Sequence, residues 1–165
     1  MICMDYHIRN AADNDLPRIS DIYAYARRFM AEHNNPHQWG LTKPSLNDLK
    51  DDIRLGNLYV VESSDRICGV FAFIIGPDPT YKMIYDGNWN YEHPYGTIHR
   101  IAGDGSGGIL QTCVNYCQQR IPYLRIDTHE DNYVMQNAIA KAGFSRCGII
   151  YIADGTPRIA YDRRI

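Results

Sequence analysis

The chain has 165 residues, 45% of them hydrophobic and 22% charged, and its formal net charge is −2. This length and composition are typical of one globular domain with a buried core, which we expect to span residues 1–165. Without a strongly basic balance, nucleic acid is not expected as a partner. No apolar run reaches the roughly 18 residues of a membrane-spanning helix, and MICMDYHIRN lacks the pattern of a secretory signal. We therefore expect a cytoplasmic protein with no membrane partner.

The cysteines favour structural thiols over a metal centre or a disulfide framework. Their number is odd and no Cys-x-x-Cys occurs. Metal sites and disulfide frameworks usually show regular cysteine spacing, which is missing here. We expect buried, reduced thiols and no bound metal. The cysteines are Cys3, Cys68, Cys113, Cys117 and Cys147.

The N-terminal half predicts two helices and a hairpin. Asp15 is placed to cap the first helix, and Ser45 with Asp48 resembles a capping box for the second. The segment 76–95 holds three prolines and five aromatic residues, and ordered loops of this length are often functional. The predicted elements are a strand over 6–9, helices over 16–33 and 46–55, and hairpin strands over 58–62 and 67–75.

The C-terminal half predicts a strand–loop–helix–strand unit and then a closing hairpin. Asn132 is placed to cap the last helix, and Gly143 is placed to end it. The predicted elements are a strand over 97–102, a glycine loop over 103–108, a helix to about 120, a strand over 124–128, a helix over 133–142, and hairpin strands over 144–152 and 158–161.

The glycine loop GDGSGG, residues 103–108, fits the spacing G-x-G-x-x-G. It lies between a strand and a helix, so it leads into a helix N-terminus, where unpaired N–H groups and the helix dipole favour an anion. We therefore predict phosphate binding, with a flexible turn as the structural alternative. Asp127, about 20 residues further on, would suit a dinucleotide ribose. The flanking elements, however, leave no room for the repeated strand–helix units of a doubly wound sheet.

The order of elements resembles the GNAT superfamily of N-acyltransferases. The residues that carry this resemblance are IRNAADNDLPRI, the glycine loop entering ILQTCVNYC, and DTHEDNYVMQNAIAKAGF. The last segment matches the family pattern Asn-x(10)-Gly-Phe, with Asn132 followed by Gly143 and Phe144. The resemblance implies an α/β (α+β) fold: a mixed, mostly antiparallel sheet with a splayed parallel strand pair, flanked by about four helices. It also implies acetyl-CoA as the co-substrate.

In the family, the diphosphate lies on the amides of the loop that opens the central helix, and the pantetheine arm lies beside the preceding strand. Three positions depart from the family pattern. Gly105 stands where the family has Arg or Gln, Leu110 replaces a small residue, and Ile139 replaces a tyrosine that many members use as general acid. The implied cofactor-binding residues are Ile101, Ala102, Gly103, Gly105, Ser106, Gly107, Gly108, Ile109 and Asn132.

The residues considered for proton transfer lie on or near the two strands that flank the expected cofactor slot. His99, Asp127, His129 and Glu130 are considered for the general base, and strand alternation suggests that His99 approaches Asp127 or His129. The alternative is that the residues after 127 cap the last helix and that His99 bonds within the sheet. Tyr151 is the candidate general acid, with ordinary packing as its alternative role.

The acceptor pocket is expected from the variable loops. Trp39 in the first loop, with Tyr85 and Trp89 in the 76–95 segment, would form an aromatic wall for an apolar or cationic group. The alternative is that these rings attach the loops to the domain. Arg100 either contacts the substrate or pairs with Asp127.

Together these observations favour an acetyl-CoA-dependent N-acetyltransferase acting on a primary amine of a small molecule or peptide by direct attack. A homodimer is compatible with the sequence. Two alternatives stay open at this point: a catalytically silent acyl-CoA-binding protein, and a nicotinamide-dinucleotide-dependent oxidoreductase, which the element order disfavours.

Overall fold

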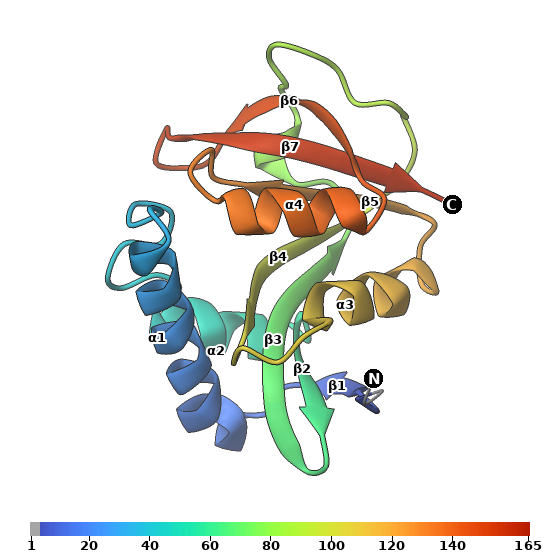
Figure 1. Cartoon of the computed structure of the whole chain (residues 1–165). Helices are drawn as coiled ribbons and strands as arrows, with labels where there is room; N and C mark the ends of the chain where they lie inside the picture. Colours follow the sequence, from blue (N-terminus) through green and yellow to red (C-terminus); the bar gives the residue numbers. More distant parts are fainter. Residues whose placement is uncertain (1–3) are drawn as a thin grey trace.

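The computed structural model describes residues 4–165. Seven strands form one sheet in the order β1-β2-β3-β4-β5-β7-β6, and four α-helices pack on it (Figure 1). The strands are β1 (His7–Asn10), β2 (Leu58–Ser63), β3 (Arg66–Ile75), β4 (Gly96–Gly103), β5 (Tyr123–Thr128), β6 (Ser145–Tyr151) and β7 (Pro157–Arg164). The helices are α1 (Leu16–Glu32), α2 (Leu46–Arg54), α3 (Ile109–Gln118) and α4 (Tyr133–Lys141).

The predicted fold class is confirmed, and each predicted element is present to within a few residues. All neighbouring strands pair antiparallel except β4 and β5. A doubly wound sheet needs a run of parallel strands, and the described sheet has a single parallel pair. The fold therefore does not support the alternative of a nicotinamide-dinucleotide-dependent oxidoreductase. The α-helices found in residues 4–165 are too short or too polar to cross a membrane.

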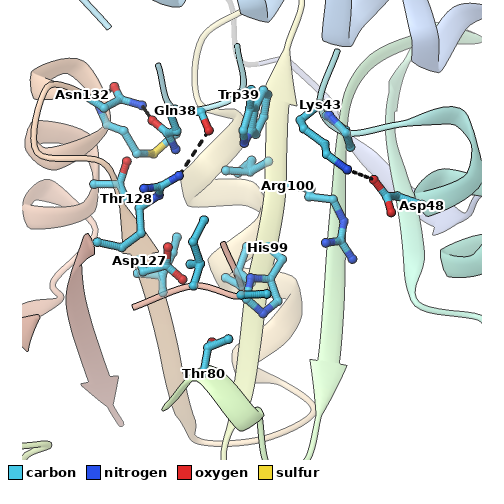
Figure 2. A pocket seen from close by; sticks show the side chains of 18 of the residues that line it. Gln38, Trp39, Lys43, Asp48, Thr80, His99, Arg100, Asp127, Thr128 and Asn132 are labelled. Atoms are coloured by element: carbon cyan, nitrogen blue, oxygen red, sulfur yellow. Dashed lines mark hydrogen bonds and ion pairs between the residues drawn. The ribbon is translucent and has the colours of Figure 1, made fainter. Parts of the chain in front are cut away.

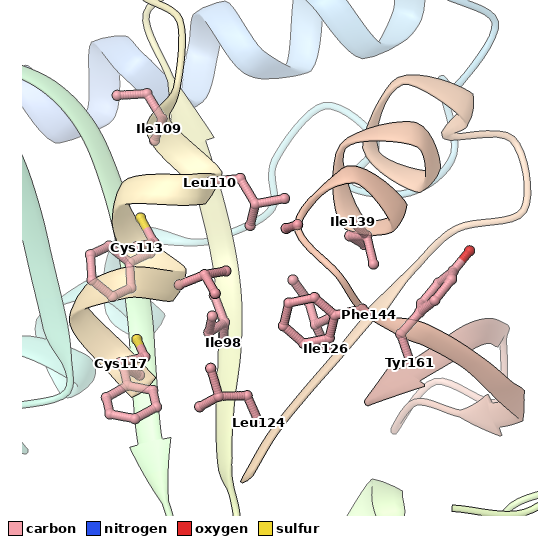
Figure 3. Packing of buried hydrophobic residues seen from close by; sticks show 14 of the residues in the cluster. Ile98, Ile109, Leu110, Cys113, Cys117, Leu124, Ile126, Ile139, Phe144 and Tyr161 are labelled. Atoms are coloured by element: carbon pink, nitrogen blue, oxygen red, sulfur yellow. The ribbon is translucent and has the colours of Figure 1, made fainter. Parts of the chain in front are cut away.

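Two apolar layers cover the two faces of the sheet. Ile19, Ile22 and Tyr23 of α1 pack with Leu49 of α2 against alternate residues of β2 and β3. On the other face, α3 and α4 cover residues of β3, β4, β5 and β7 (Figure 3). The sheet is therefore buried on both faces around its centre. The residues of this second layer that Figure 3 labels are Ile98, Ile109, Leu110, Cys113, Cys117, Leu124, Ile126, Ile139, Phe144 and Tyr161.

The parallel pair β4–β5 separates after two residues. Gly96 pairs with Leu124 and Thr97 with Arg125, and no later pair follows. The predicted splayed strand pair is thus present, and the gap opens toward the carboxyl ends of both strands. In an open sheet this edge is the usual place for a ligand.

A β-bulge in β4 lies beside this gap. His99 is opposite Ala72 and Ala102 is opposite Val70, which leaves Arg100 and the next residue facing Phe71 alone. Arg100 has a left-handed φ of 51°, which costs a non-glycine residue about 1 kcal/mol or more. The bulge interrupts the side-chain alternation of β4 after His99, so Ile101 packs in the same layer as Ile98.

Two of the three helix caps predicted from the sequence are present in the structure. Ser45 and Asp48 form the capping box of α2, and Asn132 caps α4 by accepting from the N–H of Met135. Asp15 does not cap α1 through its side chain. Its carboxylate instead accepts from the Ala12 N–H and from Arg9, because a short 3-10 turn precedes the helix.

The prediction of buried, unpaired thiols holds for the four cysteines within the described residues. Cys68, Cys113, Cys117 and Cys147 are free and buried. Burial raises the pKa of Cys117 and Cys147 to about 12, so both stay protonated and unreactive. Cys3 lies outside the described residues.

Candidate active site

The glycine loop presents unpaired donors at the start of α3. Among the described residues, no acceptor pairs with the N–H groups of Gly107, Gly108, Ile109 or Leu110. Gly108 has a left-handed φ of 78°, a conformation that favours glycine. These N–H groups and the positive end of the helix dipole form an anion site.

A cavity of about 510 Å³ runs from this loop along the gap. One wall comes from α1, including Tyr25 and Phe29, and the other from α4, including Ala138 and Lys141. Gly107 is the one predicted cofactor residue that does not line the cavity, and its carbonyl accepts from the Tyr6 hydroxyl at 2.7 Å. The predicted cofactor residues that line the cavity are Ile101, Ala102, Gly103, Gly105, Ser106, Gly108, Ile109 and Asn132.

Asn132 lines this cavity, and both polar atoms of its side chain form hydrogen bonds within the protein. Oδ1 accepts from the Met135 N–H at 3.0 Å, and Nδ2 donates to Oε1 of Gln38 at 2.8 Å. Gln38 belongs to the segment between α1 and α2, so this bond crosses the gap. A cofactor contact through Asn132 stays a prediction, and its side chain is held in place before any ligand binds.

A second cavity of about 540 Å³ adjoins the first. Met30, Ile101, Asn132 and Met135 line both. The lining of the second cavity holds more polar and charged side chains than that of the first, among apolar residues that both contain (Figure 2). The residues of its wall that Figure 2 labels are Gln38, Trp39, Lys43, Asp48, Thr80, His99, Arg100, Asp127, Thr128 and Asn132.

His99 pairs with Asp78, which the sequence argument did not consider. Nε2 of His99 lies 2.8 Å from Oδ2 of Asp78, and both residues line the second cavity. The expected partners Asp127 and His129 were wrong, because β4 and β5 have already separated at the level of His99 and the 76–95 segment places Asp78 beside it. With Asp78 as carboxylate, Nε2 carries the proton and Nδ1 keeps its lone pair.

Asp78 is held as a carboxylate. Burial alone would raise its pKa, but hydrogen bonds from His99 and Thr80 outweigh burial and lower the pKa to about 2. A carboxylate that orients an imidazole in this way fixes its tautomer and stabilises the protonated form.

This low pKa predicts how stability depends on pH. A depressed carboxylate pKa stabilises the fold above its unfolded pKa of about 4, and this contribution is lost as the pH falls toward 2. Asp78→Asn should therefore lower the free energy of unfolding by on the order of 2 kcal/mol at pH 6, with the difference vanishing near pH 2. Urea unfolding of both proteins from pH 6 to 2 tests this. A difference in the free energy of unfolding that stays constant from pH 6 to pH 2 would contradict this prediction.

Asp127 lines the same cavity and accepts a hydrogen bond from a buried tyrosine. The Tyr81 hydroxyl donates to Oδ2 of Asp127 at 2.6 Å. Burial, followed by the charge of Asp127, raises the pKa of Tyr81 well above its usual value, so Tyr81 remains a donor. Asp127 thus presents a fixed negative group to the cavity.

Arg100 pairs with Asp52 of α2, at 2.8 and 2.9 Å through two nitrogens, so the suggested pair with Asp127 was wrong. The buried Tyr23 hydroxyl donates to the Arg100 carbonyl at 2.6 Å. These contacts hold the strained residue of the bulge. Arg100 still lines the second cavity.

Other residues considered for proton transfer lie outside the residues that line the two cavities. His129 accepts at Nδ1 from the Asp131 N–H and so stabilises the turn before α4. Burial, and then the charge of Arg158, lower the pKa of His129. Tyr151 is 48% exposed and packs edge-on against Tyr85. Within residues 4–165, His, Cys, Asp and Glu side chains do not gather in groups of three suited to a metal ion.

The aromatic residues divide between the two roles considered. Trp39 lines the second cavity and packs against Tyr23. Trp89 instead donates to the Tyr81 carbonyl and stacks 3.9 Å from the Arg125 guanidinium. Tyr85 pairs with β6 through an isolated bridge. The attachment role therefore describes Tyr85 and Trp89, and the substrate role remains for Trp39.

Sequence reasoning missed several polar residues of this cavity, among them Gln38, Asp78 and Arg158. All three lie in or beside loops, and periodicity says nothing about where a loop side chain points. Asp78 stands between two prolines, which signals a turn but not its direction.

The chain is similar to several solved acetyltransferases. It is 31% identical to a GNAT-family acetyltransferase from Streptococcus agalactiae 2603, covering 100% of this chain and 99% of that one with a TM-score of 0.88. A ribosomal-protein-alanine N-acetyltransferase from Brucella melitensis shares 18% identity over 96% and 99% of the two chains, with a TM-score of 0.62. A candidate acetyltransferase from Salmonella typhimurium, solved with its cofactor acetyl-CoA, shares 13% identity over 96% and 93%, with a TM-score of 0.61. No protein-family model and no curated protein matches the chain.

Proposed function

Because the chain belongs to the GNAT family of acetyltransferases, we propose that it transfers an acetyl group from acetyl-CoA to a primary amine by direct attack. The observation that carries the proposal is the meeting of two cavities at Ile101 and Asn132, one beginning at an anion site and the other containing a histidine–carboxylate pair. The acceptor is a small molecule or a peptide.

The residues of the first cavity fit coenzyme A. The unpaired N–H groups from Gly107 to Leu110 suit a diphosphate. The apolar walls along Ile101 and Ala102 suit a slender arm. When bound, acetyl-CoA supplies a thioester activated toward nucleophiles, and the arrangement of the cavities would bring its acyl end to their junction.

His99 is proposed as the general base. A primary alkylammonium has a pKa of about 10, so the acceptor must lose a proton before it attacks. Nδ1 of His99 carries the lone pair that can take this proton, and Asp78 stabilises the resulting imidazolium. Asp127, fixed by Tyr81, would attract the ammonium of the incoming acceptor.

A tyrosine acid is not part of this proposal. Ile139, at the family's tyrosine position, is fully buried in the core. Among the described residues that line the two cavities, Tyr25 is the one tyrosine, and it stands beside the glycine loop. A thiol with a pKa near 8.5 can leave as the thiolate without a protein acid.

Thermal unfolding tests the cofactor and distinguishes it from a nicotinamide dinucleotide. A ligand at about 100 times its dissociation constant stabilises the native state by about 2.7 kcal/mol. We expect acetyl-CoA at millimolar concentration to raise the melting temperature by several degrees, and a nicotinamide dinucleotide to leave it unchanged. Stabilisation by the dinucleotide alone would overturn the proposal.

Release of free thiol with a panel of amines distinguishes the enzyme from a silent acyl-CoA-binding protein. We expect turnover above background with at least one class of amine. Binding of acetyl-CoA with no turnover on a broad panel would favour the silent alternative, for which the absence of the family's tyrosine at Ile139 is the supporting observation.

A further inference from the structure

Arg158 is a buried cation without a carboxylate partner. The residue is 5% exposed and lies at the start of β7. Its guanidinium donates to the Thr156 hydroxyl, to the Pro157 carbonyl and to the Gln38 carbonyl, all of them neutral. Within residues 4–165, no carboxylate oxygen lies within 4.0 Å of it. The acidic side chains that act on it from further away are Asp127 and Asp154.

Several arginines with buried or half-buried side chains have a form of compensation that Arg158 lacks. Arg9 and Arg100 each bind a carboxylate at 2.7 to 2.8 Å. Arg125, which is buried like Arg158, has its guanidinium 3.9 Å from the centre of each of two aromatic rings. Arg158 has neither kind of compensation, and a buried charge without compensation is costly. It lines the second cavity, where a ligand can supply the missing anion.

Thr128 adds a second unsatisfied group at the same place. Its side chain is fully buried, and Oγ1 has no hydrogen-bond partner among the described residues. The sheet register sets Thr128 opposite Ile159, the neighbour of Arg158, and Thr128 lines the same cavity. In Figure 2, Thr128 and Gln38 lie on the same side of the cavity as Asp127.

We propose that the acceptor is a small amine that carries a carboxylate, and that Arg158 and Thr128 bind this carboxylate. The inference rests on the proposed acetyl transfer and specifies its substrate class. The anionic end would lie on Arg158, while the ammonium end lies toward Asp127 and His99, so the two ends of a zwitterion meet groups of opposite charge. A guanidinium matches a carboxylate in shape as well as in charge.

Matched pairs of acceptors test the inference. Glycine, β-alanine and 4-aminobutyrate are each compared with the corresponding amide, which keeps the amine and the size but removes the negative charge. We expect kcat/KM for the best acid to exceed that of its amide by roughly 10-fold or more, as a charge-assisted hydrogen bond implies. Equal or higher kcat/KM for the amides would overturn the inference.

Substitution of Arg158 ties the preference to this residue. In Arg158→Gln the acid-to-amide ratio should fall to about 1, mainly through KM for the acid, while KM for acetyl-CoA stays unchanged. Arg158→Lys keeps the charge and should retain part of the ratio. Arg163→Gln removes a cation from the same strand away from the cavities and should keep the ratio of the wild type. A ratio that survives Arg158→Gln would contradict the inference.

The two proposals fail in different ways. If neutral amines are acetylated and the acids are not, the transfer reaction stands and the carboxylate site is wrong. If no amine of either kind is acetylated, the transfer reaction itself is contradicted. Melting temperatures of the variants, measured in parallel, show whether Arg158→Gln folds. If Arg158→Gln does not fold, Arg158→Lys serves as the test instead. An unchanged KM for the acids in Arg158→Lys would overturn the inference.

Discussion

Replacing His99 by alanine is expected to lower kcat for acetyl transfer by about 100- to 10,000-fold, the usual contribution of a positioned general base. The reason is geometric: His99 faces the second cavity with Nε2 bonded to Asp78, which leaves Nδ1 to accept the acceptor's proton. KM for acetyl-CoA should change little, because His99 does not line the first cavity. Steady-state kinetics across pH 6 to 9 measures both values.

The pH profile distinguishes a base from a packing residue. If His99 takes the proton, the residual activity of His99→Ala should rise with pH. The reason is that the fraction of the acceptor amine that is already deprotonated in solution increases with pH. Asp78→Asn should show a smaller loss, since it weakens the orientation of the imidazole but leaves its nitrogen. His7→Ala, on the exposed edge strand β1, is the matched histidine control and should behave as wild type. Wild-type activity in His99→Ala would assign the base to another group.

Gly107→Asp should weaken binding of coenzyme A by roughly 30-fold or more. A carboxylate a few ångströms from a diphosphate is unfavourable by about 2 kcal/mol even with strong screening, and each 1.4 kcal/mol is tenfold. Gly107 suits this test better than Gly108. A side chain at Gly107 meets nothing within 4 Å and its φ is not left-handed, whereas Gly108 has a φ of 78°.

Gly107→Ala is the matched control, because it adds a methyl group without charge. Its affinity for coenzyme A should stay within a few-fold of wild type, and both variants should unfold at nearly the wild-type temperature. Titration calorimetry measures the affinities. An unchanged affinity in Gly107→Asp would remove the glycine loop from the cofactor site.

The sequence predicted the parts of the molecule that depend on local signals. The glycine loop, the capping box at Ser45 and the cap at Asn132 each follow from the chemistry of a few adjacent residues. The apolar period of 3.6 or 2 residues then placed the helices and strands within a few positions. The splayed strand pair was a different kind of prediction, because it came from a family resemblance and not from periodicity.

The partners of the site residues depended on features without a local signal. The bulge at Arg100 requires a left-handed arginine, which no residue preference would suggest. It is held by Tyr23 and Asp52, distant in sequence. The partner of His99 came from a loop whose path is set by long-range packing of Tyr81 and its neighbours. Strand alternation suggested Asp127 or His129 as the partner of His99, whereas the structure pairs His99 with Asp78.

The divergence of β4 and β5 gives the sheet two inner edges in addition to the outer ones at β1 and β6. Exposed edges invite strand addition by other proteins and aggregation. Here α1 and α4 stand on either side of the opening, and the bond from Gln38 to Asn132 crosses it. A folded partner cannot enter such a slot, whereas a single unbranched chain can. The molecule thus keeps an interior sheet edge open to a slender ligand while shielding it from folded partners.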